Sequence, residues 1–301
     1  MIIKKRFKSK ELLIMELLEK RMNLSTQQKS YLQSLERGYR GEVLFDNLIE
    51  TLHCECLILN DLLLNYNNTT FQIDSLLITS NQVNVFEIKN YEGDYIYESD
   101  RLFTISKKEI INPLHQLNRS KFLLQQLILE QGYSFNIEAF VIFINPYFTL
   151  YQAPLNKPFI FPTQINSFLN KLNQNRAQLG ERQKQLAKLL LSLHIYDSPY
   201  SQIPDYNYEQ LKKGITCHQC ESFSLKIDGK LCICQSCGYK ESVTTAITRS
   251  VEEFKLLFPD KLITTNIIYE WCKIINSKKR IQRTLASNYK KVGNNKWAYY
   301  E

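Results

Sequence analysis

The chain has 301 residues, of which 44% are hydrophobic and 23% are charged, and its formal net charge is +8 at pH 7. This composition supports a sizeable folded core and excludes global disorder. The positive charge favours acidic partners such as nucleic acid or an anionic membrane surface, although a solvated basic surface alone gives the same charge.

The N-terminus and the cysteines indicate the compartment. The run MIIKKRFKSKELLIMELLEKR starts basic, but Glu11 and Glu16 interrupt its apolar stretch, so it does not read as a signal peptide. No stretch approaches about 18 consecutive apolar residues, which predicts that no segment spans a membrane. Five of the eight cysteines fall between residues 217 and 237. This favours a metal site in a reducing cytoplasm over a disulfide framework.

The first two thirds of the chain alternate between helical and strand patterns. Apolar residues recur at helical spacing in four segments: 9–22, 35–52, 112–132 and 175–194. The third segment has Asn112 as a candidate N-cap and Pro113 at the first helical position. Four segments read as strands or hairpins: 54–64, 71–93, 95–106 and 137–144. This order predicts a mixed α/β (α+β) core that ends near residue 196.

The rest of the chain is divided by changes in composition. Residues 196–210 contain Pro199 and Pro204 and show no clear period, which is typical of a linker. The predicted division is an N-terminal helical extension at 1–34, a core domain at 35–196, a linker at 197–211, a cysteine module at 212–243 and a C-terminal domain at 247–301.

The stretch FQIDSLLITSNQVNVFEIKNYEG places Asp74, Glu87 and Lys89 in an otherwise apolar hairpin. If Ser80-Asn81 is a two-residue turn, cross-strand partners have numbers that sum to 161, and Asp74 lies opposite Glu87. Lys89 then shares the face of Glu87, because side chains alternate along a strand. Opposed carboxylates repel each other unless a cation such as Mg²⁺ lies between them. The alternative is a solvent-facing hairpin end where Glu87 and Lys89 only pair.

These residues also carry a family resemblance. Asp74 with Glu87-Ile88-Lys89 resembles the D…(D/E)-x-K motif of the restriction-endonuclease-like superfamily. More narrowly, residues 37 to 131 are similar to the nuclease-related domain family, NERD. The matching pieces are GYRGE (38–42), QID (72–74), EIKNYEG (87–93) and NPLHQ (112–116). The resemblance covers roughly a third of the chain.

The resemblance implies a restriction-endonuclease-like core, with a mixed central sheet flanked by helices, that hydrolyses phosphodiester bonds with Mg²⁺ or Mn²⁺. It makes Asp74 and Glu87 the metal ligands and Lys89 the catalytic lysine. It makes Glu42 a helix carboxylate that faces the site as a metal or water ligand, and Gln116 a helix side chain that touches the site or a phosphate. The alternatives are an acid favoured near a helix start for Glu42 and a plain exposed glutamine for Gln116.

The cysteine module contains two C-x2-C pairs, Cys217 with Cys220 and Cys234 with Cys237. Such pairs suit tetrahedral Zn²⁺ held by four thiolates. They predict a zinc ribbon whose metal serves folding. Cys232 offers a further thiol that competes with Cys234 for the fourth position, and the C-x2-C symmetry favours Cys234.

The C-terminal segment predicts a helix near 267–275, a second helix capped by Asn276 or Ser277, and a hairpin in KKVGNNKWAYY with a Gly-Asn turn. This order resembles a winged helix-turn-helix. Four cations gather at the start of the second helix, where a recognition helix meets phosphates or bases. They are Lys278, Lys279, Arg280 and Arg283. The alternative is a small helical module with a solvated basic face.

Together these features predict a cytoplasmic, metal-dependent DNA nuclease, with RNA also open as a substrate, whose zinc ribbon and C-terminal domain hold the nucleic acid. One rival is a non-catalytic nucleic-acid-binding protein that keeps the nuclease fold as a scaffold. Another is an adaptor whose zinc module docks a partner such as a helicase or a repair or defence complex. The opposed acids argue against the first rival, and the basic C-terminus argues against a purely protein partner.

Overall fold

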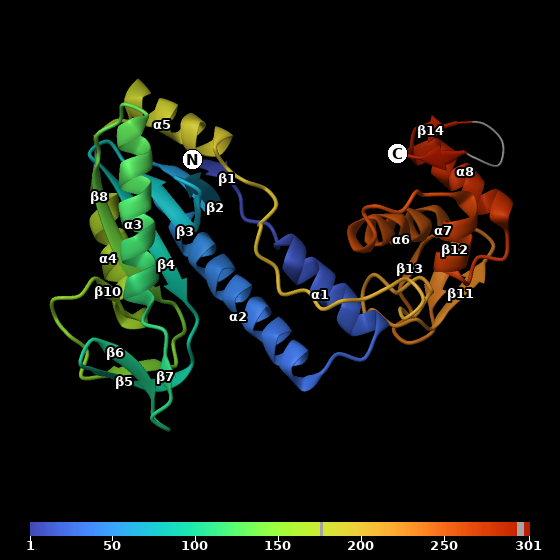
Figure 1. Cartoon of the computed structure of the whole chain (residues 1–301), viewed down its shortest axis with the longest axis horizontal. Coiled ribbons are helices and arrows are strands. Elements are labelled where there is room, and N and C mark those ends of the chain that lie inside the picture. The colour runs from blue at the N-terminus through green and yellow to red at the C-terminus, as the bar shows by residue number, and fades with distance from the viewer. Residues whose placement is uncertain (175–176, 294–297) are drawn as a thin grey trace. The chain divides into compact units, whose positions relative to one another are not determined.

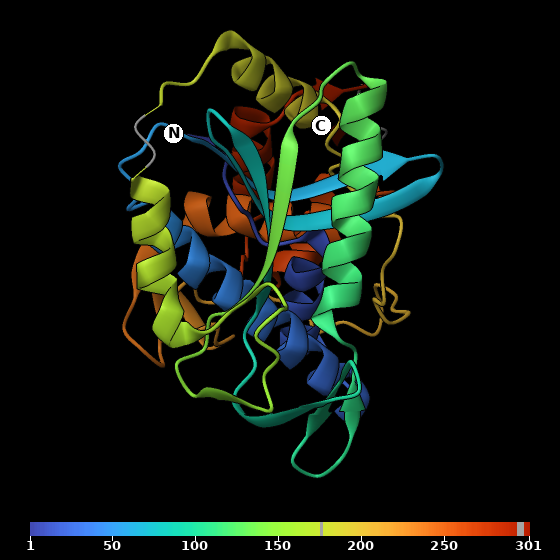
Figure 2. The same cartoon turned by 90° about the vertical axis from the view of Figure 1, so that its left-hand side faces the viewer.

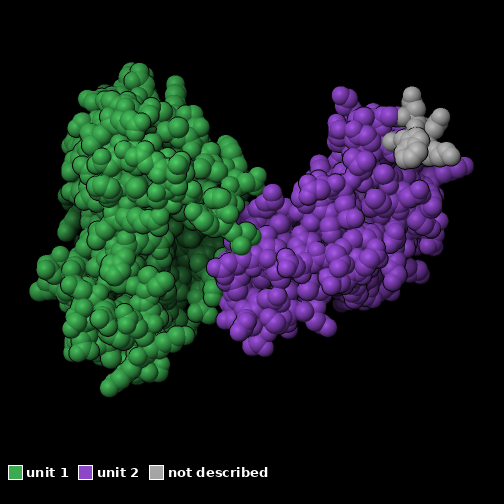
Figure 3. All heavy atoms as spheres, viewed as in Figure 1, with its two compact units in different colours: residues 1–8, 33–201 green, residues 9–32, 202–301 purple. Residues whose placement is uncertain are grey.

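The computed structural model describes residues 1–174, 177–293 and 298–301. These residues form two compact units (Figure 3). Unit 1 comprises residues 1–8 and 33–201, and unit 2 comprises residues 9–32 and 202–301. No helix of the described chain is both long enough and apolar enough to cross a membrane.

Unit 1 is built from one large sheet, one small sheet and four helices (Figures 1 and 2). Its strands are β1 (Ile2–Lys4), β2 (Leu57–Tyr66), β3 (Thr69–Ile78), β4 (Gln82–Lys89), β5 (Gly93–Glu98), β6 (Arg101–Thr104), β7 (Glu109–Ile110), β8 (Asn136–Phe143), β9 (Phe148–Tyr151) and β10 (Phe159–Ile160). Its helical elements are α2 (Thr26–Ile49, in unit 1 from residue 33), α3 (Pro113–Glu130), the 3₁₀ turn η1 (Pro162–Gln164), α4 (Ile165–Asn173) and α5 (Glu181–Ser192).

The large sheet has the strand order β1-β2-β3-β4-β8-β10. Strands β2, β3 and β4 run antiparallel, whereas β1 is parallel to β2, and β4, β8 and β10 are mutually parallel. The predicted mixed α/β core with a central mixed sheet flanked by helices is therefore confirmed. A smaller sheet, β7-β6-β5-β9, follows the carboxyl end of β4.

Strand β4 is apolar on both faces because helices cover both sides of the sheet. Val83 and Val85 belong to the core that includes apolar side chains of α3 and α5. Phe86 and Ile88 alternate with them and belong to a second core with side chains of α2 and α4. Figure 2 shows β8, next to β4, between α3 and α4. Such two-sided burial is typical of strands in parallel or mixed sheets.

Several elements of the fold were not expected from the sequence. Strand β1 has only three residues, too few to show a period. Helix α4 does place Ile165, Phe168, Leu169 and Leu172 at helical spacing, a signal that was not used to predict it. Helix α2 begins at Thr26 instead of near residue 35, because Ser25 and Gln28 form a reciprocal cap. The Ser25 Oγ accepts from the Gln28 N–H (3.2 Å), and the Gln28 Oε1 accepts from the Ser25 N–H (2.8 Å).

Unit 2 combines the N-terminal helix with the C-terminal third of the chain. Its elements are α1 (Lys10–Arg21), β11 (Leu225–Asp228), β12 (Leu231–Cys234), β13 (Lys240–Ser242), α6 (Val243–Leu257), α7 (Thr265–Cys272), α8 (Lys278–Asn288), β14 (Lys291–Val292) and β15 (Tyr299–Tyr300). Arg21 anchors α1 there. Its guanidinium donates to the Lys212 and Gly214 carbonyls (2.8 and 3.2 Å), pairs with Glu253 and lies 4.2 Å from the Trp271 ring centroid.

The C-terminal prediction is matched in part. Ser277 caps α8, because its side chain accepts from the Arg280 N–H. Strands β14 and β15 pair antiparallel, whereas the predicted Gly293-Asn294 turn lies partly outside the described residues. Helix α6, which begins at the Ser242 cap, was not expected. The winged-helix interpretation of this segment stays a prediction.

Candidate active site

The β3–β4 hairpin has the register that the sequence predicted. The Thr79 N–H donates to the Gln82 carbonyl at 2.9 Å, which closes the two-residue turn. The backbone ladder ends at the pair Ser75 and Phe86, whose numbers sum to 161. A local turn of defined length thus sets which side chains meet at the far end of the hairpin.

Beyond that last pair the strands separate, and side chains take over from the backbone. Asp74 is 5% exposed and accepts the Ile88 N–H with its Oδ2 at 2.8 Å. Glu87 is 2% exposed, and its Oε1 lies 2.6 Å from the Lys89 Nζ. Lys89 also donates to the Gln116 Oε1 at 3.2 Å, which links β4 to α3. The structure therefore brings these four predicted site residues together at the carboxyl end of β4.

Helix α2 brings Glu42 to the same place because Gly41 permits a close approach. A Cβ on Gly41 would lie only 2.4 Å from the Asn90 Cβ, so any larger residue forces the helix away from the end of β4. Asn90 holds the helix there, since its Nδ2 donates to the Arg37 carbonyl at 2.9 Å. The GYRGE piece thus has a packing reason for its second glycine.

The N-terminal segment supplies site residues that sequence reasoning missed. The Arg6 guanidinium donates to the Glu42 Oε2 (2.6 Å), to both carboxylate oxygens of Asp46 (2.8 and 3.1 Å) and to the Asp74 carbonyl (2.6 Å). Asp46 follows Glu42 by one helical turn, a spacing that could have singled it out. Nothing local in the sequence connects Arg6 to residues so far along the chain.

Lys4 and Asp61 form a second set of contacts, on β2. The Lys4 Nζ donates to the Asn60 and Asp61 carbonyls at 2.9 and 2.7 Å. Asp61 has a φ of 54°, a left-handed conformation inside a strand. Its Oδ1 accepts from the Gln72 Nε2 at 2.8 Å. The ammonium of Lys4 thereby holds the backbone where β2 departs from regular geometry.

Burial and mutual repulsion raise the pKa values of the acids. Burial raises the pKa of Glu87 to about 8, with Asp74 adding to the rise and Lys89 opposing it. Burial raises the pKa of Glu42 to about 7, again with Asp74 adding and Arg6 opposing. The pKa of Asp74 is also raised by burial, against the effects of Lys89, the Ile88 N–H and Arg6. A cation near these groups would favour their charged forms.

Lys89 carries the compensating charge. Burial by itself would lower the pKa of Lys89, but the carboxylates of Glu87 and Asp74 outweigh it and raise that pKa. The buried Glu87 Oε1 lies near this ammonium but accepts no well-directed hydrogen bond from any described residue. Carboxylate oxygens are the ligands that a hard divalent cation such as Mg²⁺ or Mn²⁺ prefers, so the acids at this end of β4 fit such an ion.

The four cysteines of the two C-x2-C pairs form a second site, in unit 2. Within the described chain they are the one group of at least three His, Cys, Asp or Glu whose ligand atoms all lie within 4.8 Å of one another. The Cys217–Cys237 and Cys220–Cys234 sulfur distances are 3.6 and 3.5 Å. A tetrahedral zinc–thiolate site, with bonds of about 2.3 Å, spaces its sulfurs about 3.8 Å apart. The cluster could therefore bind a structural metal ion such as zinc.

The two halves of this cluster are built alike. The Gln219 N–H donates to the Cys217 sulfur, and the Ser236 N–H donates to the Cys234 sulfur, each at 3.4 Å. N–H groups of Cys237 and Ser236 oppose the effect of burial and lower the pKa of Cys234 to about 6. Cys232 is buried on β12 outside the cluster. The preference for Cys234 over Cys232 is thereby supported.

A comparison with known families agrees with the geometry in unit 1. Residues 37–144 match the model of the family described as NERD, nuclease-related domain. No curated protein and no solved structure gave a match to the chain. The matched range contains Glu42, Asp74, Glu87, Lys89 and Gln116 and supports a nuclease-related function for this part of the chain.

Outside the range that the family model matches, α8 presents the predicted basic side chains. Lys278, Lys279 and Arg283 are exposed, and Arg280 is partly exposed. The Lys278 Nζ donates to the Asn266 Oδ1 at 3.0 Å. The same ammonium lies 5.3 Å from the Tyr269 ring centroid, and no salt bridge of the described chain involves any of the four cations.

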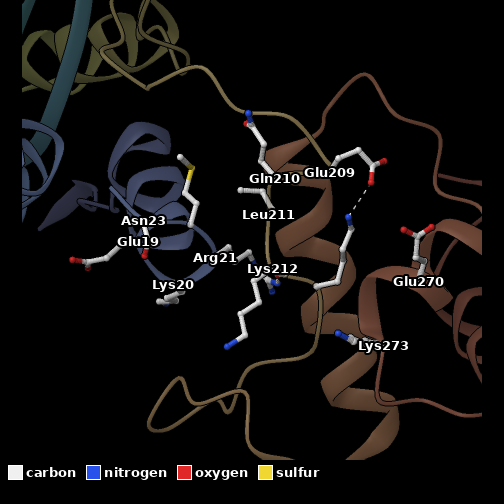
Figure 4. A pocket seen from close by; sticks show the side chains of 12 residues that line it. Glu19, Lys20, Arg21, Asn23, Glu209, Gln210, Leu211, Lys212, Glu270 and Lys273 are labelled. Carbon is white, nitrogen blue, oxygen red and sulfur yellow. Dashed lines mark hydrogen bonds and ion pairs between the residues drawn. The ribbon is translucent and has the colours of Figure 1, made fainter. Parts of the chain in front are cut away.

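A hollow of about 810 Å³ in unit 2 was not predicted (Figure 4). It lies between the end of α1, residues 209–213 and the end of α7. Several of its cations already have acidic partners: Lys20 pairs with Glu221, Arg21 with Glu253 and Lys213 with Glu209. Its mixed charge selects no class of ligand, and we assign it none.

Proposed function

We propose that this protein is a metal-dependent nuclease that hydrolyses phosphodiester bonds in DNA. One observation carries the proposal: Asp74 and Glu87 are both buried at the carboxyl end of β4, with Lys89 paired to Glu87, inside the range that matches the nuclease-related domain. Burying two acids with raised pKa values costs folding free energy, a cost that a bound cation would offset. A non-catalytic scaffold has no need of them.

Each side chain of the site has a proposed role. Asp74 and Glu87 would hold Mg²⁺ or Mn²⁺, and the ion supplies Lewis acidity toward a phosphate and an attacking water. Lys89, held between Glu87 and Gln116, directs its ammonium at the reacting oxygens and stabilises their developing charge. Glu42 adds a third carboxylate that can orient the water. Gln116 is exposed, and with its Oε1 bonded to Lys89 its amide nitrogen could contact a phosphate.

The proposal is tested by cleavage of labelled single-stranded DNA, double-stranded DNA and RNA by the purified full chain. Mg²⁺ or Mn²⁺ is expected to support DNA cleavage and EDTA to abolish it. Asp74→Asn keeps an acceptor for the Ile88 N–H but removes the charge, and should lower the rate at least about 100-fold. Asp94→Asn, at an exposed position of β5, is the matched control. A wild type inactive with every substrate and metal, or an Asp74→Asn variant as active as wild type, refutes the proposal.

We further propose that unit 2 holds the substrate through the basic side chains of α8, with zinc stabilising the neighbouring β11–β13 module. Replacing all four cations by alanine should weaken DNA binding. The slope of log Kd against log salt should fall by about one unit for each phosphate that the variant no longer neutralises. A control variant with the same change in charge replaces four cations outside α8 by alanine: Lys171, Arg182, Lys184 and Lys188. It shows whether the loss of affinity depends on where the cations lie or only on net charge. Equal loss of affinity in both variants would refute the placement on α8.

A further inference from the structure

Arg6 contacts two segments, α2 and β3, that are distant from it in sequence and that both contribute residues to the proposed site. Its guanidinium joins Glu42 and Asp46 on α2 to the backbone carbonyl of Asp74 on β3. The pairing of β1 with β2 holds Arg6 in place, with Ile2 opposite Ile58 and Lys4 opposite Leu59. In the strand order β1-β2-β3-β4, the N-terminal segment therefore reaches Asp74 on β3 from the β1 edge of the sheet, whereas Glu87 lies on β4, on the other side of β3.

The burial of Arg6 decides how it can act. Its side chain is 2% exposed, so it cannot touch a DNA strand or a bulk phosphate. The described polar partners of its guanidinium are the carboxylates of Glu42 and Asp46 and the backbone carbonyl of Asp74. Any effect of Arg6 on catalysis must therefore pass through Glu42 and Asp74, either by fixing their positions or by its charge.

The geometry of these contacts requires arginine specifically. Both oxygens of Asp46 are met by the Nε and one terminal nitrogen of the planar guanidinium. The other terminal nitrogen reaches Glu42 in the same plane. A lysine ammonium is a point charge with freely rotating donors and cannot span these three acceptors. Replacing Arg6 by lysine therefore keeps the positive charge but removes the planar set of hydrogen bonds, so the two effects can be measured separately.

We propose that Arg6 is a positioning residue of the active site, which fixes the Glu42 carboxylate and the Asp74 backbone for metal binding. This inference rests on the nuclease function proposed above. It places an essential part of the site 31 residues before the start of the family match at residue 37. Mutating a residue that hydrogen-bonds to a metal ligand typically lowers metal affinity or activity about 10- to 100-fold, and we expect a loss of this order when Arg6 is replaced.

The test compares wild type with Arg6→Lys in two assays on the full chain: Mn²⁺ binding followed by electron paramagnetic resonance, and steady-state DNA cleavage. Arg6→Lys keeps the charge and loses the planar contacts. We expect the Kd for Mn²⁺ to rise about 10-fold or more and kcat to fall by about 10- to 100-fold, with KM for DNA unchanged. Arg101→Lys, a 63% exposed side chain that pairs with Glu109, is the matched control.

The outcomes separate the alternatives. Wild-type values for Arg6→Lys in both assays would mean that only charge is needed, and would overturn the positioning role. If Arg6→Lys fails to fold, as judged by circular dichroism, Asp46→Asn decides, because it removes the carboxylate charge that orients the Arg6 guanidinium toward Glu42 and Asp74. A folded Asp46→Asn with unchanged Mn²⁺ affinity and kcat would also overturn it. A wild type that neither binds Mn²⁺ nor cuts DNA refutes the proposed function, and this inference with it.

Discussion

Replacing Lys89 by methionine is expected to lower kcat for DNA cleavage by about 100- to 1,000-fold. Methionine fills similar space but removes the ammonium that lies 2.6 Å from Glu87 and 3.2 Å from Gln116. The lost group would otherwise stabilise charge on the reacting oxygens, an effect that is strong in a site screened from water. The variant should therefore lose rate more than it loses substrate affinity.

The same substitution makes a prediction about pH. Lys89 opposes the rise in the pKa of Glu87, which already lies at about 8, so Lys89→Met should raise that pKa further. Glu87 must lose its proton to bind a cation, so the variant should bind Mn²⁺ poorly near pH 7 and regain affinity as the pH rises above 8. Its kcat should stay low at every pH, because the ammonium itself is missing.

The measurement is a set of pH profiles for kcat and for the Kd of Mn²⁺ with wild type, Lys89→Met and Lys108→Met. Lys108 is exposed in the turn between β6 and β7 and serves as the control. Recovery of kcat together with metal affinity at high pH would show that Lys89 only tunes Glu87. That result would contradict the assigned catalytic role.

Cys217→Ser is expected to release the metal of the second site and unfold the β11–β13 module. Apparent zinc-binding free energies of small metal-stabilised domains reach about 10–16 kcal/mol near pH 7, which exceeds what three short strands can supply by packing. Serine is a poor ligand for Zn²⁺, because soft thiolates hold the ion much better than a hydroxyl.

This prediction is checked by zinc content after dialysis and by thermal unfolding, with Cys232→Ala as the matched control. Cys232 is 1% exposed on the same module but lies outside the cluster, so its alanine variant should keep one zinc per chain. Loss of zinc from Cys232→Ala with retention in Cys234→Ser would reverse the assignment of the fourth ligand. A wild type without zinc would refute the zinc site.

Part of this protein was determined by short-range sequence signals. The two-residue turn at Ser80-Asn81 set the register that leads to Asp74 and Glu87, because side chains repeat every two residues in a strand. The Asn112 cap with Pro113 set the start of α3, and thereby the place of Gln116. The spacing of the C-x2-C pairs was also sufficient, because each pair closes its own tight turn.

Only the tertiary structure decided what surrounds those groups. Arg6 meets Asp46 across 40 residues and Asp74 across 68, through a three-residue strand with no periodic signal. Helix α1 joins the C-terminal elements through Arg21, whose contacts span up to 232 residues. Local patterns specify turns, caps and registers. The burial that raises the pKa of Glu87, and the arginine that holds Glu42, arise only when segments far apart in the chain pack together.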